Sequence, residues 1–356
     1  MTANMNIAGG KPRIEWVDFA KGVSIIMVVM LHVSLGVQKA LADCTWFAYI
    51  VEWARPFRIP AFFLLSGLFL SRRVNWPWRE FIDRRVVHFA WFYIVWLVIS
   101  FIFKGPVFAR EFGIDGTLKM FALSFIDPFG TLWFIYLLAI FAVVAKILKD
   151  VPAWIVWPAA ALLETLRIHT GWMVPDEFAS RFVYFYTGVI AAPHVFRFAD
   201  ALKRLSLPAL FAALLGWALV EAVFVFKDMA RLPGISLILG LAGSLAVAAV
   251  GVWLHHAATT WPWARWLDAF RFLGQNTLTV YVSFFVFMGA TRTVLVKVAP
   301  WLGPDVISVI VLAAAITGPL LLHALVKGTA LRFLYQRPAW FSILPRQPRQ
   351  RLHPAE

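Results

Sequence analysis

Charged residues and cysteines are both scarce in this chain. Asp, Glu, Lys and Arg make up 15% of its 356 residues, whereas soluble domains contain about 25%. Hydrophobic residues make up 61%, and the mean hydropathy is +0.76. One core cannot bury that much apolar surface, so the excess must face lipid. The single cysteine, Cys44, excludes an internal disulfide. We therefore predict an integral membrane protein.

Several ligand-binding signatures are also missing. The sequence has no Gly-rich phosphate loop and no zinc-ligand spacing. The adjacent His255 and His256 point apart on a helix, so we predict no metal site. The net charge of +14 comes from Lys and Arg in short segments between apolar runs, where they set topology and meet lipid headgroups. We therefore expect no nucleic-acid partner.

Ten apolar runs have roughly the 20 residues that a membrane-spanning helix needs. They are apolar all round rather than alternating, which favours helices over barrel strands. The runs are 16–37, 46–71, 83–103, 118–147, 151–168, 180–198, 207–227, 233–254, 268–290 and 303–334. No small-residue cleavage pattern follows the first, so we expect a retained span rather than a cleaved signal. The last is long enough for a helix to run out of the membrane.

Orientation follows from the basic residues between the runs. With both termini in the cytoplasm, the inner connections hold about twice as many Lys and Arg as the outer ones, as the positive-inside rule requires. The prediction is an all-α integral membrane protein of about ten transmembrane helices. Its parts are a cytoplasmic N-terminal segment (1–15), a transmembrane domain (16–335) and a basic cytoplasmic tail (336–356).

The first run, "DFAKGVSIIMVVMLH", contains three polar side chains that a helix places on one face. At 100° per residue Asp18, Lys21 and His32 align, with Lys21 and His32 roughly 16 Å apart along the axis. Each charge near a bilayer centre costs on the order of 2.5–3.5 kcal/mol. Asp18 and Lys21 form either a structural ion pair or part of a site. His32 either bridges two helices through a hydrogen bond or carries protons in catalysis.

The second run, "EWARPFRIPAFFLLSGLFLSRR", combines charge with helix breakers. Glu52, Arg55 and Arg58 are three residues apart and can form one polar stripe. Pro56 and Pro60 remove backbone donors, which predicts a broken helix. Irregular backbone at membrane depth must be covered by protein or line a watery cavity. We therefore predict a polar cavity between the first two runs, with one arginine available for an anionic ligand.

A basic segment, "SRRVNWPWREFIDRR", follows the second run. Arg72, Arg73, Arg84 and Arg85 lie close to one membrane surface in the predicted topology. They can satisfy the positive-inside rule alone, or they can bind the phosphates of a nucleotide-like donor. The sequence leaves both interpretations open.

The stretches "WVDFAKGVSIIMVVMLH" and "RIPAFFLLSGLFLSRR" resemble the acyltransferase 3 family of multi-spanning membrane O-acyltransferases. The Asp-x-x-Lys-Gly opening is most similar to its fucose 4-O-acetylase-like branch. Three later stretches agree with the family as well, so that the resemblance covers most of the chain. They are "LWFIYLLAI" from Leu132, "FVYFYTGVIAA" from Phe182 and "LGQNTLTVYVSFF" from Leu273.

The resemblance implies transfer of an acyl group, usually acetyl, from acetyl-CoA to a hydroxyl of a cell-surface carbohydrate or glycolipid. Acyl-CoA is then a co-substrate, no cofactor is permanently bound, and the expected location is a bacterial inner membrane. Three positions depart from the family's pattern. Lys21 stands where the family commonly has arginine, His88 replaces the second arginine of an Arg-x-x-Arg pair that begins at Arg85, and Phe284 replaces a histidine that many members carry.

We expect His32 to be the general base, because the unperturbed pKa of histidine, about 6.5, suits proton transfer at neutral pH. Asp18 and Lys21 complete the expected catalytic group. The expected donor-binding and substrate-binding residues are Glu52, Arg55, Arg58, Ser66, Arg72, Arg73, Arg84, Arg85, Trp133, Asn276 and Tyr281.

A transporter or flippase for a lipid-linked or small anionic substrate is the alternative. Charged residues at depth and a broken helix suit that class equally well. Direct transfer and an acyl-histidine intermediate both stay open, and so does the oligomeric state.

Overall fold

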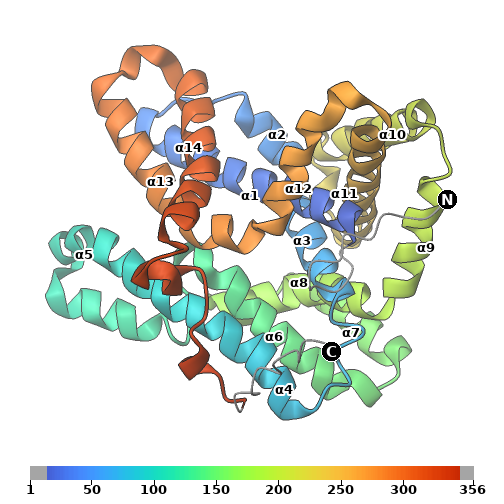
Figure 1. Ribbon diagram of the computed structural model, residues 1–356, viewed down its shortest axis with the longest axis horizontal. Coiled ribbons are helices and arrows are strands. Elements are labelled where there is room, and N and C mark those ends of the chain that lie inside the picture. The colour runs from blue at the N-terminus through green and yellow to red at the C-terminus, as the bar shows by residue number, and fades with distance from the viewer. Residues whose placement is uncertain (1–13, 345–356) are drawn as a thin grey trace, which may run out of the picture.

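The computed structural model describes residues 14–344, which form helices and connecting turns without a strand (Figure 1). The predicted all-α class is thereby confirmed. The helices are α1 (Glu15–Leu41), α2 (Phe47–Trp53), α3 (Arg58–Leu68), α4 (Trp78–Ile82), α5 (His88–Leu123), α6 (Trp133–Ile147), α7 (Ala153–Leu166), α8 (Met173–Ile190), α9 (Ala192–Leu202), α10 (Leu207–Phe226), α11 (Ile235–Thr260), α12 (Asp268–Gln275), α13 (Thr277–Val298) and α14 (Gly303–Val326). Most of the N-terminal segment and the end of the basic tail lie outside the described residues.

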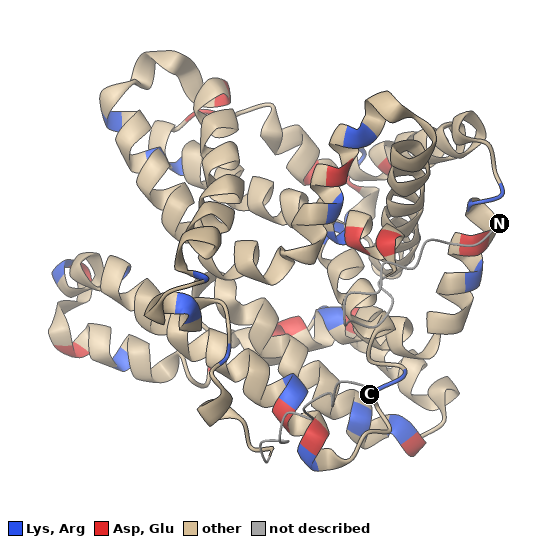
Figure 2. Cartoon of the chain, in the orientation of Figure 1, with Lys and Arg blue, Asp and Glu red and all other residues tan. Residues whose placement is uncertain are grey.

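Among residues 14–344, seven helical segments are long and apolar enough to cross a membrane. They are Glu15–Leu41, Trp78–Leu123, Gly130–Asp150, Leu207–Phe226, Ile235–Thr260, Thr277–Val298 and Pro300–Val326. In Figure 2 the charged positions lie mostly towards helix ends, with long uncharged stretches between them. These features make the chain a multi-pass membrane protein.

Several of the ten predicted spans differ from the helices that the structure forms. Run 46–71 is divided between α2 and α3, and run 151–168 gives the shorter α7. Run 180–198 is broken between α8 and α9, and run 268–290 is broken between α12 and α13. The count of ten crossings and the orientation therefore stay predictions. The expectation of one long helix over 303–334 is wrong. Helix α14 ends at Val326, and Thr329 caps a separate 3₁₀ turn after Gly328.

The predicted break in the second span is present between α2 and α3. Arg58, the first residue of α3, is only 5% exposed. Its Nη1 donates a hydrogen bond of 2.8 Å to the carbonyl of Val51 in the last turn of α2. This bond satisfies a carbonyl that the end of the helix leaves unpaired, so a buried arginine joins the two halves.

Helix α1 lies at the centre of the molecule and packs against α3, α11, α12, α13 and α14 (Figure 1). Its crossing with α12 depends on glycine. A Cβ added at Gly22 would lie 2.0 Å from the carbonyl oxygen of Phe270, and one added at Gly274 would lie 1.7 Å from that of Asp18. Small residues allow such close backbone approach in membrane proteins. This crossing holds the Asp18 end of α1 in place.

The first residues of the predicted tail pack against the protein. Arg337 forms an ion pair with the buried Asp83, with 2.6 Å between Nη2 and Oδ2. The Ser342 hydroxyl and the Ile343 backbone N–H each donate a 2.8 Å hydrogen bond to Oδ1 of the same carboxylate. Asp83 begins a π-helical turn, Asp83–Val87, between α4 and α5. The chain after α14 thus fixes the turn that carries Arg84 and Arg85.

Substituting Gly274 with alanine should destabilise the protein. The new methyl group overlaps the α1 backbone, and overpacking of this kind costs roughly 1–3 kcal/mol. We expect Gly274→Ala to lower the midpoint of thermal unfolding in detergent. The control is Gly216→Ala in α10, where nothing lies within 4 Å of the added Cβ. Equal midpoints for the two variants would refute the close crossing.

Candidate functional site

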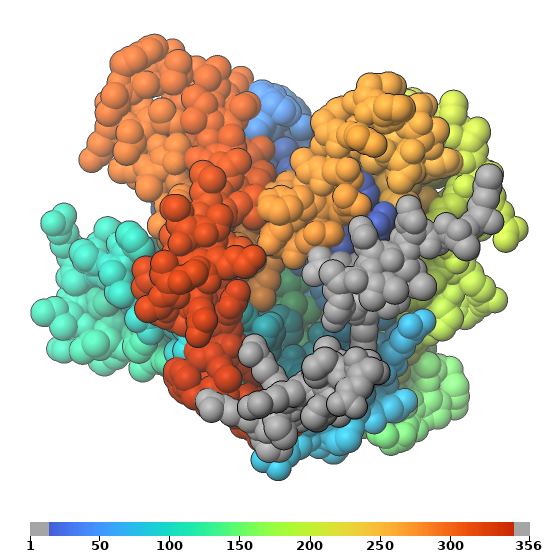
Figure 3. All heavy atoms as spheres, viewed as in Figure 1, coloured from blue at the N-terminus to red at the C-terminus, as the bar shows by residue number. Residues whose placement is uncertain are grey.

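Two adjoining cavities lie beside the Asp18 end of α1. One of about 530 Å³ is lined by Asp18, Lys21, Arg72 and Arg73, among others. The other, of about 380 Å³, is lined by Lys21, Arg73, Arg85, Ser66 and Tyr281 with apolar neighbours. The two share Lys21, Phe69, Arg73, Gly274 and Gln275. We call them together the cationic cavity. In Figure 3 the face of the molecule is hollowed near the centre, between the orange and red segments and the cyan ones.

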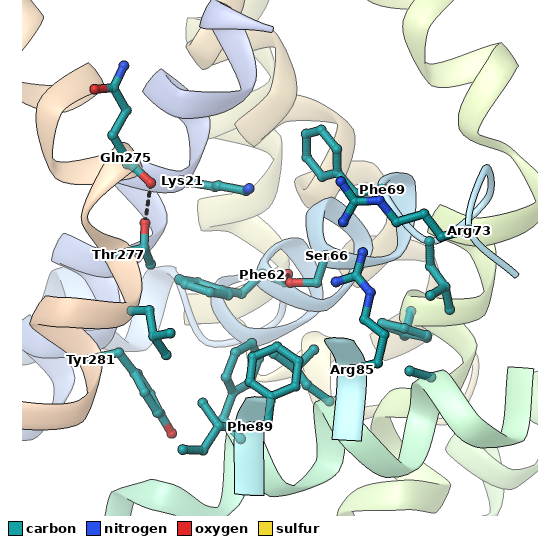
Figure 4. A pocket seen from close by; sticks show the side chains of 18 residues that line it. Lys21, Phe62, Ser66, Phe69, Arg73, Arg85, Phe89, Gln275, Thr277 and Tyr281 are labelled. Carbon is teal, nitrogen blue, oxygen red and sulfur yellow. Dashed lines mark hydrogen bonds between the residues drawn. The ribbon is translucent and has the colours of Figure 1, made fainter. Parts of the chain in front are cut away.

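Four cations line the cationic cavity: Lys21, Arg72, Arg73 and Arg85. In Figure 4 the side chains of Arg73 and Arg85 enter from one side and that of Lys21 enters from the other. Nε and Nη2 of Arg85 are buried without a hydrogen-bond partner among residues 14–344. Burial lowers the pKa of the Arg73 guanidinium, and the nearby charge of Arg84 lowers it further. Since burial and a like charge disfavour the cation of Arg73, and Arg85 has buried N–H groups without a partner in the described residues, a bound anion would stabilise the two arginines.

A smaller cavity of about 140 Å³ lies farther along α1 and contains His32. We call it the His32 cavity. Phe62, Phe134 and Tyr281 line both this cavity and the cationic one, and Trp133 completes an aromatic wall. The Tyr281 hydroxyl donates to the carbonyl of Thr131, which fixes its ring. The polar face predicted for α1 therefore runs from the cationic cavity to His32.

His32 lies half-buried against an aromatic ring, with cations nearby. Its ring centroid is 5.3 Å from that of Phe284, and the charges of Arg58 and Lys104 act on it. Within the described part of the chain, no protein group hydrogen-bonds to the imidazole. The structure therefore gives no support to a histidine that bridges two helices through a hydrogen bond, and the imidazole lines a cavity instead.

Six of the predicted binding residues line these cavities. They are Ser66, Arg72, Arg73, Arg85, Trp133 and Tyr281. The structure thus brings together the arginines at the end of the second span, the aromatic residues of α6 and α13, and the predicted catalytic residues of α1.

The other five predicted binding residues do not line the three cavities. Glu52 and Arg55 form an ion pair of 2.9 Å with each other, and Arg58 joins α2 to α3. Arg84 pairs with Glu80 at 3.0 Å on the surface. Asn276 donates its amide to the carbonyl of Phe272 in the preceding turn. Each of these five residues makes a contact with a group nearby in the sequence.

Sequence reasoning missed several residues of the site. Phe62 and Phe134 form walls, but apolar residues in apolar helices give no signal. Gln275 lines the cationic cavity in place of its neighbour Asn276, and the break between α12 and α13 at that point decides which of the two faces inward. The charge of Lys104 acts on His32, although the two residues lie far apart in the sequence.

One comparison with known proteins gives a match. The family model described as "Acyltransferase domain" matches residues 14–324. This range contains every residue that lines the three cavities. No curated protein and no solved structure matches the chain.

The cationic cavity should admit an anionic thiol reagent. In a Cys44→Ser chain, we expect Ser66→Cys to react with a sulfonate-bearing methanethiosulfonate, and faster than with a cationic one, because Lys21, Arg73 and Arg85 attract anions. Ser24→Cys is the matched control. Both hydroxyls donate to a carbonyl four residues earlier, but Ser24 is 0% exposed. Equal labelling of the two thiols, or a preference for the cationic reagent, would contradict this description of the cavity.

Proposed function

The chain belongs to the acyltransferase family whose model covers residues 14–324, and we propose that it is a membrane O-acyltransferase. It would move an acyl group, acetyl in the simplest case, from acyl-CoA to a hydroxyl of a cell-surface or exported carbohydrate. The observation that carries this proposal is the shared lining of the two cavities. Aromatic residues connect a cation-rich space to a histidine on the same face of α1.

The cationic cavity suits the phosphates of the donor. Arginine forks bind phosphate through two parallel hydrogen bonds, and Arg73 and Arg85 enter this cavity together. The acyl group of an acyl-CoA lies at the far end of a long flexible arm. That arm would pass Ser66 and reach the aromatic wall at Tyr281, beside the His32 cavity.

His32 would act as the general base at the far end of this path. A ring nitrogen takes the proton of the acceptor hydroxyl while its oxygen attacks the thioester carbonyl carbon. The new C–O bond forms, the C–S bond breaks, and the CoA thiolate leaves with the proton returned by the imidazolium. The charges of Arg58 and Lys104, which act on His32, would stabilise the oxyanion of the tetrahedral intermediate.

The two ends of α1 would face opposite sides of the membrane. The basic connections favour the cytoplasm for the Asp18 end, where acyl-CoA would be available, and a bacterial inner membrane suits an exported acceptor. The acceptor would then reach His32 from the outer side. In this arrangement the acyl group travels along α1 while the polar parts of both substrates stay on their own sides.

Replacing His32 with alanine should abolish transfer while donor binding persists. Loss of a general base costs roughly 10²–10⁴-fold in rate. The measurement uses purified protein in nanodiscs with radiolabelled acetyl-CoA, and follows CoA release and label transfer to a panel of glycosides. His194→Ala, at an exposed position on α9, is the control and should keep full activity. Substrate flux without any chemical change, in folded wild-type protein, would favour the transporter class instead.

Replacing Arg85 with glutamine should weaken donor binding. A lost charge-assisted hydrogen bond costs about 1.5–3 kcal/mol, so we expect the Kd for acetyl-CoA to rise by roughly 10- to 100-fold. The matched control is Arg204→Gln, which removes one exposed cation from the same predicted side. Calorimetric titration of both variants would measure the difference. An unchanged Kd for Arg85→Gln would leave this arginine a role in topology alone.

A further inference from the structure

A second group of cations surrounds α1 next to His32. Arg58 of α3 and Lys104 of α5 both act electrostatically on the imidazole, and Lys104 and Arg292 of α13 act on each other. A Cβ added at Gly36 would lie 2.4 Å from Nη1 of Arg292. Gly36 is four residues after His32 and so shares its face of the helix. Three helices thus bring Arg58, Lys104 and Arg292, which we call the outer cluster, close to this part of α1.

Two carboxylates close to Arg58 and its neighbours pair with other cations. Glu52 lies 2.9 Å from Arg55 and 3.7 Å from Arg231, and Glu177 pairs with Arg181 at 3.1 Å. The charge of Glu52 reaches Arg58 only at longer range. Within residues 14–344, no carboxylate lies within ion-pair distance of Arg58, Lys104 or Arg292. The outer cluster therefore has excess positive charge.

Contacts within the protein hold these cations in place without neutralising them. The Lys104 ammonium lies 5.0 Å from the ring centroid of Phe129 and 5.6 Å from that of Phe285, as in cation–π pairs. Arg58 donates one hydrogen bond to a backbone carbonyl, but its Nε is buried without a hydrogen-bond partner in the described residues. Burying an uncompensated charge at such depth costs free energy, and a bound anion would offset that cost.

The donor does not need this second group of cations. Its phosphates have Arg73 and Arg85 at the other end of α1, since Lys21 and His32 are roughly 16 Å apart along the helix. The group that must approach His32 from the outer side is the acceptor. Trp133 and Phe134 line the His32 cavity, and aromatic rings of this kind can pack against the apolar face of a sugar.

We propose that the outer cluster binds an anionic group, a carboxylate or a phosphate, on the acceptor carbohydrate. This inference rests on the proposed acyl transfer and specifies its acceptor: an acidic sugar rather than a neutral one. Arg292 and Lys104 are half-buried and so accessible to a ligand. Arg58 is more deeply buried, and its positive charge adds to the attraction for an anion. The anion would orient the sugar so that a neighbouring hydroxyl meets His32.

Binding of two matched sugars tests the inference directly. p-Nitrophenyl β-glucuronide and p-nitrophenyl β-glucoside differ only at C6, which is a carboxylate in the first and a hydroxymethyl group in the second. Equilibrium dialysis against protein in zwitterionic nanodiscs measures the binding of both. We expect the glucuronide to bind at least about tenfold more tightly, since charge-assisted hydrogen bonds are the strong ones. The double variant Lys104→Gln, Arg292→Gln should remove most of that preference. The variant Lys104→Arg, which retains the positive charge, should keep the preference for the glucuronide.

The control for net charge is Lys39→Gln, at an exposed position near the end of α1, which should leave the preference intact. Equal binding of the two sugars, binding of neither, or a preference that survives the double variant would overturn the inference. Loss of the preference in nanodiscs that contain anionic lipid would also overturn it, because a headgroup would then be the occupant.

Transfer assays separate this inference from the acyltransferase proposal. Acetyl transfer to the glucoside as fast as to the glucuronide would refute the anionic acceptor and leave the enzyme proposal standing. Preferential glucuronide binding without CoA release from acetyl-CoA would refute acyl transfer and leave the outer cluster as a site for an acidic sugar.

Discussion

Charge in a membrane protein must face other protein or water, and helix α1 carries two charged side chains and an imidazole along one face. The fold meets that constraint by surrounding α1. Helix α12 approaches so closely that Gly22 and Gly274 have no room for a side chain, and α3 and α13 cover the same helix farther along. The cavities beside Lys21 and His32 lie where this cover is incomplete. Packing around a single polar helix therefore determines where ligands can enter.

Two groups of cations lie at different positions along α1. Arg73 and Arg85 lie at one end, and the outer cluster lies at the other, next to His32. Aromatic residues occupy the region between them. An acyl group is uncharged and can move through this aromatic region. Moving a phosphate or a carboxylate into it would cost a large desolvation free energy. The arrangement thus suits a reaction in which two anionic substrates stay apart and only the neutral group is exchanged.

Periodicity predicted the helical class and the shared face of Asp18, Lys21 and His32, and the prolines Pro56 and Pro60 predicted the break between α2 and α3. Periodicity does not show which side chain of a helix meets a cavity, and it could not predict which member of an adjacent pair faces one. Arg85 lines the cationic cavity while Arg84 pairs with Glu80 at the surface, because the π-helical turn and its contacts with Asp83 set the rotation. Such long-range contacts leave no local signal in the sequence.

We propose that acyl-CoA binds with its phosphates at Arg73 and Arg85 and its acyl group at His32. The most direct test is a cryo-EM structure of the protein with an acetyl-CoA analogue whose thioester is replaced by an unreactive thioether ketone. We expect density for the phosphates next to both guanidinium groups, and density for the acyl carbonyl beside the His32 imidazole. Phosphates bound elsewhere, or an acyl group that ends away from His32, would contradict this proposal.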